Sequence, residues 1–109
     1  VGTAHGLYKG EPKIRFDIIR EVAEKIPVPI VLHGGSGVPD DAIREAIRCG
    51  VGKINVNTEN QVACTNKIRE ILGKDDKVYD PRKYLGPARE AMIEVVAEKI
   101  RLFGSSNQA

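Results

Sequence analysis

The stretch of sequence that decides the fold is Val28-Pro29-Ile30-Val31-Leu32-His33-Gly34-Gly35-Ser36-Gly37. Its short apolar run, preceded by proline and followed by glycines, is typical of a parallel strand buried on both faces. A histidine follows the strand directly, and imidazole is a common metal ligand. The glycines let successive backbone N–H groups converge on one point, which suits an anion such as phosphate.

Strand-like and helical segments alternate on both sides of this stretch, which favours parallel βα units and an α/β fold. We expect strands at residues 1–3, 29–32 and 53–56. Helices are expected from 16 to 26, after Pro39, from 58 or 59 to 72 with Gly73 as C-cap, and from 86 to 103. Residues 74–84 are expected to form an exposed connection with at most one short helical turn. Apolar residues at helical spacing should face inward, namely Ile18, Ile19, Val22, Ala23, Ile26, Ile43, Ala46, Ile47, Ala88, Ala91, Met92, Val95, Val96 and Ile100.

Composition excludes several classes of protein. The 109 residues include 5% aromatic residues and no Trp, so the core is expected to be aliphatic. Basic and acidic residues are mixed along the sequence and give a formal charge of +2. The basic residues form no continuous stripe, so nucleic acid is not an expected partner. The sequence contains no run of about 18 apolar residues, so it predicts no membrane-spanning helix. Cys49 and Cys64 lack metal-site or disulfide spacing, so we expect reduced thiols and a cytoplasmic protein.

The first residues, Val1 to Gly6, look like the end of a strand and its following loop. No initiator Met and no signal peptide precede them. We therefore expect the chain to begin inside the fold.

Each expected strand ends in a polar or glycine-rich segment: 3–6, 33–37 and 55–58. Because parallel strands present their carboxyl ends on one face, His5 and His33 are expected to be neighbours there. Two imidazoles suit zinc, which needs at least one further protein ligand. A single histidine is more often a hydrogen-bonded loop residue than a metal ligand. Here both histidines of the chain follow strands at corresponding positions, which favours the metal site.

The glycine loop and the segment after the third strand each allow two interpretations. Gly34 to Gly37 matches neither a dinucleotide fingerprint nor a P-loop, so it is either a generic phosphate nest or a tight βα turn. The Ser36 hydroxyl and the helix that follows Pro39 favour the anion. Asn55, Asn57 and Thr58 are either ligand contacts or the N-cap of the next helix. Arg82 lies in the expected connection, where most arginines are simply solvated.

Four motifs occur in this order: GTAHGLYKG (2–10), VLHGGSG (31–37), KINVNTE (53–59) and YDPRKYLGPAR (79–89). With them the chain resembles the C-terminal part of class II, zinc-dependent ketose-bisphosphate aldolases, most closely the bacterial fructose-bisphosphate aldolases. The resemblance implies a (β/α)₈ TIM barrel, which takes about 250 residues. Residues 1–109 would then be a C-terminal fragment of that single domain, comprising the last three βα units and the terminal helices.

The resemblance also implies the roles of particular residues. His5 and His33 would be zinc ligands, while the remaining zinc histidine and the proton-transferring aspartate are expected upstream, so no catalytic residue is nominated here. Arg82 would reach the second phosphate, across a dimer interface. A monovalent cation, Na⁺ or K⁺, is expected near Gly6 and Gly34. The phosphate of dihydroxyacetone phosphate would be held by Gly6, Gly34, Gly35, Ser36, Asn55, Val56, Asn57 and Thr58.

The implied activity is the reversible, zinc-dependent cleavage of fructose 1,6-bisphosphate into dihydroxyacetone phosphate and glyceraldehyde 3-phosphate, a step of glycolysis and gluconeogenesis. A divalent metal would act as the Lewis acid for the enediolate, so no Schiff-base lysine is required. The family usually forms homodimers or larger homo-oligomers, and we expect the 109-residue chain alone to be inactive. Two alternatives stay open: a tagatose-1,6-bisphosphate aldolase, or a non-catalytic phosphate-binding partial barrel.

Overall fold

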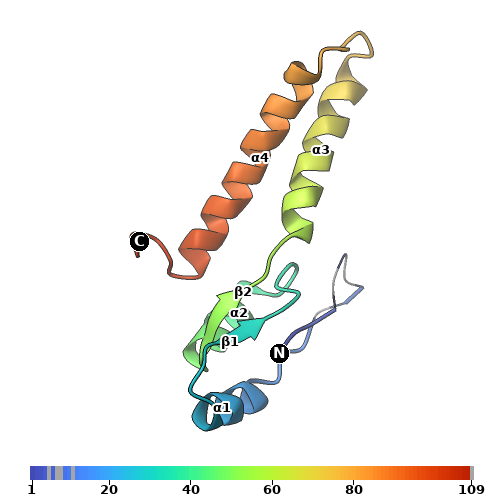
Figure 1. Cartoon of the computed structure of the whole chain (residues 1–109). Helices are drawn as coiled ribbons and strands as arrows, with labels where there is room; N and C mark the ends of the chain where they lie inside the picture. The colour runs from blue at the N-terminus through green and yellow to red at the C-terminus, as the bar shows by residue number, and fades with distance from the viewer. Residues whose placement is uncertain (5, 7–8, 11, 109) are drawn as a thin grey trace.

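The computed structural model describes residues 1–4, 6, 9–10 and 12–108. In chain order its elements are α1 (Phe16–Lys25), β1 (Ile30–Leu32), α2 (Asp40–Arg48), β2 (Val51–Ile54), α3 (Thr58–Lys74) and α4 (Pro81–Leu102). Helices alternate with the two strands, and two long helices follow β2 (Figure 1). The expected α/β class is therefore confirmed for the described residues.

The strands β1 and β2 pair in parallel, with Ile30 opposite Val51 and Leu32 opposite Ile54. A third segment joins them through one parallel bridge between Gly2 and His33. The first expected strand is thus reduced to a single bridge. The expected bounds of the last strand were wrong, because β2 begins at Val51 and ends at Ile54. Its following residue, Asn55, divides its backbone hydrogen bonds between two segments, donating to the Leu32 carbonyl and accepting from the Gly35 N–H.

A small aliphatic core surrounds this sheet, as the composition predicts. Ile43 and Ala46 of α2 are buried against it, whereas Ile18 and Ile26 of the expected inward stripe on α1 are exposed. This part of the predicted stripe was wrong: Ile19 is the buried residue of α1, and Phe16, Val22 and Ala23 pack against the core beside it. The buried cluster consists of Ile19, Ile30, Leu32, Val38, Ile43, Ala46, Cys49 and Val51. Both cysteines are free thiols, as expected.

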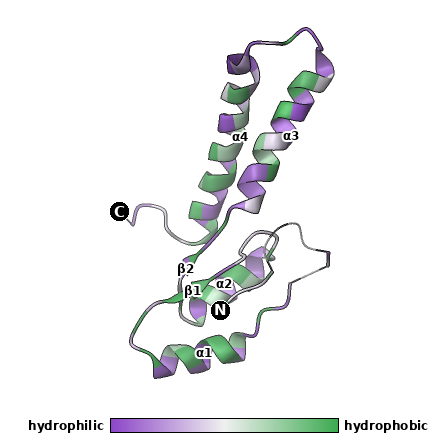
Figure 2. Ribbon diagram, turned by 45° about the vertical axis from the view of Figure 1, so that its right-hand side comes forward, coloured by the Kyte–Doolittle hydropathy of each residue, from purple (hydrophilic) through white to green (hydrophobic). Residues whose placement is uncertain are grey.

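The helices α3 and α4 form an antiparallel hairpin that extends away from the sheet (Figure 1). Hydrophobic and hydrophilic residues alternate along both of them (Figure 2). No described residue of α3 is buried, and on α4 only Ala88 is. Val96 and Ile100 are each 43% exposed, so the prediction that they face inward was wrong. The radius of gyration of 17.1 Å exceeds the roughly 13 Å of a compact domain of this length, because the hairpin packs mainly on itself.

The start of α4 also differs from the prediction, since the helix begins at Pro81 and not at Gly86. The Asp80 side chain caps it by accepting a hydrogen bond from the Arg82 N–H at 3.0 Å, and Pro81 occupies the first helical position. This signal outweighs the Gly86-Pro87 pair, which lies inside the helix. Gly73 is likewise not a C-cap, because α3 continues to Lys74.

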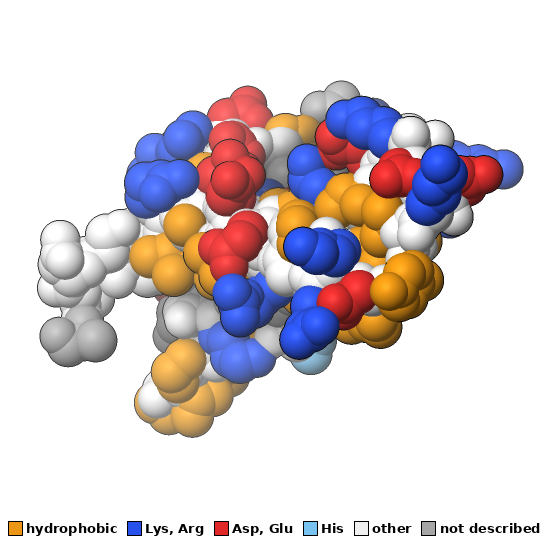
Figure 3. Space-filling model, turned by 90° about the horizontal axis from the view of Figure 1, so that it is seen from above, with side chains coloured by type: hydrophobic (Ala, Val, Ile, Leu, Met, Phe, Trp, Pro, Cys, Tyr) orange, Lys and Arg blue, Asp and Glu red, His pale blue; other side chains and the backbone are white. Residues whose placement is uncertain are grey.

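The surface carries charges of both signs. On the face seen in Figure 3, basic and acidic side chains are interspersed with hydrophobic ones, and no continuous basic field appears. Among the described residues, no helix is both long enough and apolar enough to cross a membrane.

Candidate functional site

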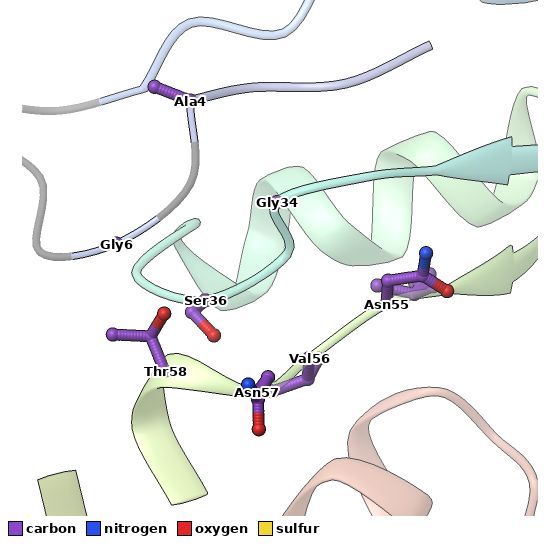
Figure 4. A pocket seen from close by; sticks show the side chains of 9 residues that line it. Ala4, Gly6, Gly34, Ser36, Asn55, Val56, Asn57 and Thr58 are labelled. Carbon is purple, nitrogen blue, oxygen red and sulfur yellow. The ribbon is translucent and has the colours of Figure 1, made fainter. Parts of the chain in front are cut away.

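A cavity of about 460 Å³ lies at the carboxyl ends of β1 and β2, a size suited to a small ligand (Figure 4). Three segments of the chain form it: the N-terminal segment, the glycine loop after β1, and the link from β2 into α3. Its lining residues are Ala4, Gly6, Gly34, Ser36, Ile54, Asn55, Val56, Asn57 and Thr58. The convergence of strand ends that the sequence predicts is therefore present.

Seven of the nine lining residues belong to the predicted substrate-binding set: Gly6, Gly34, Ser36, Asn55, Val56, Asn57 and Thr58. Gly35, the eighth residue predicted for this phosphate site, is buried behind the wall, with its N–H donating to the Asn55 carbonyl at 2.9 Å. Ala4 and Ile54 also line the cavity but were missed. Their side chains carry no polar group, so only their positions next to the motifs could have indicated them.

The glycine loop is shaped by close contact with the N-terminal segment. Gly34 has a φ of +68°, and a Cβ built there would lie 2.7 Å from the Thr3 Oγ1. The Thr3 hydroxyl donates to the Gly34 carbonyl at 2.6 Å. Because an L side chain at Gly34 would be strained and would also collide, glycine is required at this position.

Two of the loop's backbone N–H groups already have protein acceptors. The Gly35 N–H donates to the Asn55 carbonyl at 2.9 Å. The Gly37 N–H donates to the Glu59 carboxylate at 2.8 Å. The converging nest expected for the loop is therefore not formed by these two amides, and the loop resembles the alternative, a tight βα turn.

The N-terminus of α3 offers a better place for an anion. Thr58 is its first residue, and the side chain of the N-cap residue, Asn57, makes no capping hydrogen bond. The Ser36 Oγ lies 3.4 Å from the Glu59 backbone nitrogen, so this hydroxyl adjoins the first turn of the helix, beside Thr58 (Figure 4). A helix N-terminus carries partial positive charge and unpaired amides, which together favour phosphate. Asn57 is thus the N-cap residue of α3 by position and also lines the cavity, so ligand contact stays a prediction.

His33 is exposed directly after β1. Its Nδ1 lies 3.0 Å from the Asn55 Nδ2, and Lys53 donates to the Asn55 Oδ1. The Asn55 amide therefore lies against the His33 ring, and the ring nitrogen that carries the proton decides which of the two groups donates.

The metal site can be tested only in part. His5, the other predicted ligand, lies outside the described residues. Within the described part of the chain, no three His, Cys, Asp or Glu side chains are grouped so that they could hold a metal ion. Imidazole nitrogen is a usual zinc ligand, and a zinc site has at least three protein ligands. A zinc site here would therefore need His5, His33 and a further ligand from elsewhere.

Arg82 is not brought to the cavity within this chain. It lies at the end of the α3–α4 hairpin remote from the sheet, where its guanidinium pairs with Asp80 at 2.7 Å (Figure 1). This hydrogen-bonded pair holds the pKa of the Asp80 carboxyl below its usual range. The contact of Arg82 with a second phosphate therefore stays a prediction.

Two charged residues next to the cavity were also missed. Glu59 follows the predicted Thr58 and could have been found as an acidic residue in the first turn of a helix. Lys99 pairs with it at 2.6 Å from 40 positions further along the chain, which no local pattern indicates.

Comparison with known proteins identifies the family of this chain. The family model described as "Fructose-bisphosphate aldolase class-II" matches residues 1–108. The fructose-bisphosphate aldolase of Staphylococcus epidermidis is 56% identical over 109 residues, which are the whole of this chain and 38% of that protein. The fructose-bisphosphate aldolase of Geobacillus stearothermophilus is 51% identical over the same span. The chain thus covers well under half the length of these curated relatives.

Solved structures show the same fold. The YdjI aldolase of Escherichia coli K12 superposes with a TM-score of 0.82 at 36% identity, over 97% of this chain and 38% of that one. The fructose-bisphosphate aldolase of Campylobacter jejuni gives a TM-score of 0.75 over 84% of this chain and 35% of that one, and at 24% identity it supports the fold alone.

Proposed function

The chain belongs to the class II fructose-bisphosphate aldolase family, and from this premise we propose that it supplies part of the active site of a zinc-dependent aldolase. The proposed reaction is the reversible cleavage of fructose 1,6-bisphosphate into dihydroxyacetone phosphate and glyceraldehyde 3-phosphate. The observation that carries the proposal is the cavity of about 460 Å³, where the glycine loop and the N-terminus of α3 meet at the strand ends.

The role proposed for this cavity is to hold the phosphate of dihydroxyacetone phosphate. Ser36 and Thr58 offer hydroxyl donors, and α3 offers the partial positive charge of its N-terminus. These contacts lie away from the carbons that react, so they orient the substrate and contribute binding energy to the transition state. Asn55 also contacts the ring of His33, with its Nδ2 3.0 Å from the Nδ1.

The metal belongs to the proposal as well, with His33 and His5 as two zinc ligands. When bound, a divalent metal supplies Lewis-acid stabilisation of the negative charge that cleavage leaves beside the carbonyl. The proton-transferring group is proposed to lie outside this chain. The complete barrel, a homo-oligomer, a cytoplasmic location, the monovalent cation near Gly34 and the role of Arg82 are further parts of the same proposal.

A chimera tests the proposal directly. This chain replaces the 109 matched residues of the Staphylococcus epidermidis relative, and the parent enzyme serves as control. We expect the chimera to cleave fructose 1,6-bisphosphate, to lose activity on chelation and to recover it with Zn²⁺. Activity that persists without metal and is lost on borohydride trapping with substrate would disprove the metal mechanism.

The same chimera distinguishes the two alternatives. Faster turnover of tagatose 1,6-bisphosphate than of its fructose epimer would change the assigned substrate. A folded chimera that binds phosphate but cleaves neither sugar would favour the non-catalytic interpretation. His33→Ala should remove activity while leaving phosphate binding within about threefold of the unsubstituted chimera, because the phosphate contacts come from the loop and α3.

A further inference from the structure

Glu59 joins the glycine loop to α3 beside the proposed phosphate site. One carboxylate oxygen accepts from the Gly37 N–H at 2.8 Å. The backbone N–H of Glu59 is directed at the Ser36 hydroxyl at 3.4 Å. One residue of α3 therefore contacts two consecutive residues of the loop, and one of these, Ser36, lines the cavity.

Lys99 of α4 holds Glu59 in turn. Its Nζ lies 2.6 Å from the second carboxylate oxygen, and the two side chains are only 17% and 28% exposed. In every other ion pair between described residues the basic side chain is at least 38% exposed. A sheltered pair is screened less by solvent than the surface pairs, so its charges matter more to their surroundings.

The charge of Glu59 poses a problem for an anion site. A carboxylate that accepts from Gly37, next to Ser36, repels an incoming phosphate. The Lys99 ammonium neutralises the Glu59 carboxylate by pairing with it directly. Lys99 is not among the described residues that line the cavity. The cation therefore affects phosphate through Glu59 and not through a contact of its own.

We propose that Glu59 and Lys99 are positioning residues for the phosphate site, with Glu59 fixing the glycine loop against α3 and Lys99 neutralising the carboxylate so that phosphate can approach. The inference rests on the proposed function, which assigns a phosphate to this cavity. It adds two residues to the site and couples phosphate affinity to α4, an element outside the cavity wall.

The experiment exploits the opposite signs that the proposal predicts for the two residues. In the chimera, Lys99→Met leaves an uncompensated carboxylate and should raise KM for fructose 1,6-bisphosphate roughly tenfold with little change in kcat. Glu59→Gln removes the charge but keeps an acceptor for Gly37, so KM should stay equal or fall. The double variant should return KM to within about threefold of the unsubstituted chimera.

A matched control and the contrary outcomes complete the design. Lys74→Met removes an exposed lysine from the Glu70 ion pair on α3 and should leave KM unchanged. If both Lys99→Met and Glu59→Gln raise KM, or if the double variant is no better than Lys99→Met, the pair is merely structural and the proposal is wrong. Glu59→Ala, which also removes the Gly37 acceptor, should raise KM and should not be rescued by Lys99→Met.

A second readout separates this inference from the proposed function. Inorganic phosphate is titrated into the chimera and its variants while the Gly37 and Ser36 amide signals are followed by NMR. The apparent Kd should rise in Lys99→Met and return in the double variant, even if the chimera shows no aldolase activity. Absence of activity with this pattern would count against the proposed reaction alone, and a Kd unchanged in Lys99→Met would overturn the role of the pair.

Discussion

Gly34→Ala should be far more damaging than its nearest matched control, Gly37→Ala. Both glycines have positive φ, +68° and +76°, so each substitution strains the backbone by about 1–2 kcal/mol. Only Gly34 is also crowded: a Cβ there would lie 2.7 Å from the Thr3 Oγ1, 2.8 Å from the Thr3 carbonyl oxygen and 2.9 Å from the Ala4 carbonyl oxygen. Nothing lies within 4 Å of a Cβ at Gly37.

The difference between the two variants isolates the cost of this contact. Pushing apart well-packed atoms costs roughly 1–3 kcal/mol, so Gly34→Ala should lower the free energy of unfolding by roughly 2–5 kcal/mol. Two of the three crowding atoms are backbone oxygens, which cannot move without moving the N-terminal segment. Gly37→Ala should cost only the backbone strain of about 1–2 kcal/mol.

Urea unfolding of the chain, followed by far-UV circular dichroism, measures both values against the unsubstituted chain. Losses that agree within about 0.5 kcal/mol would refute the close packing of the loop on the N-terminal segment. In the chimera, Gly34→Ala should also raise KM more than Gly37→Ala does, because it displaces a residue of the cavity wall.

Two further predictions concern other parts of the chain. Lys67 and Lys74 donate to Glu70 and lower its pKa from 4.5 to about 2, so its stabilising effect should be complete above about pH 4.5 and be lost as the pH falls toward 2. An NMR titration of the Glu70 carboxyl carbon checks this, and a midpoint near 4.5 would contradict the pairing. In the core, Ile43→Ala should cost about 2–5 kcal/mol of unfolding free energy. Ile93→Ala, at a position 51% exposed, should cost under about 0.5 kcal/mol, and equal losses in denaturant titrations would contradict the assigned core.

The sequence predicts best what depends on neighbouring residues. The strand before His33 and the glycine turn after it follow from apolar residues and glycines in immediate succession. The link from Asn55 to Thr58 is placed at the cavity for a similar reason, because parallel strands must bring their carboxyl ends together.

Predictions failed where distant segments decide the outcome. The exposure of Val96 depends on what packs against α4, and its own helical pattern does not contain that information. The start of α4 was misplaced because Gly86 and Pro87 provide a local signal that competes with the cap at Asp80 and Pro81. Two valid start signals lay six positions apart, and the side-chain hydrogen bond of Asp80 decided between them.

The hydrogen bonds of the loop amides bear on how the proposed site would recognise phosphate. Glycines after a strand suggest that backbone amides bind the anion, yet the N–H groups of Gly35 and Gly37 donate to protein acceptors. The glycines instead let the loop approach its neighbours closely, as the contacts around Gly34 show. In the proposed phosphate site, we therefore expect the attraction to come mainly from the N-terminus of α3 and the hydroxyls beside it. Since Glu59 lies in that same first turn and pairs with Lys99, we expect phosphate affinity to depend on the α3–α4 hairpin as much as on the loop.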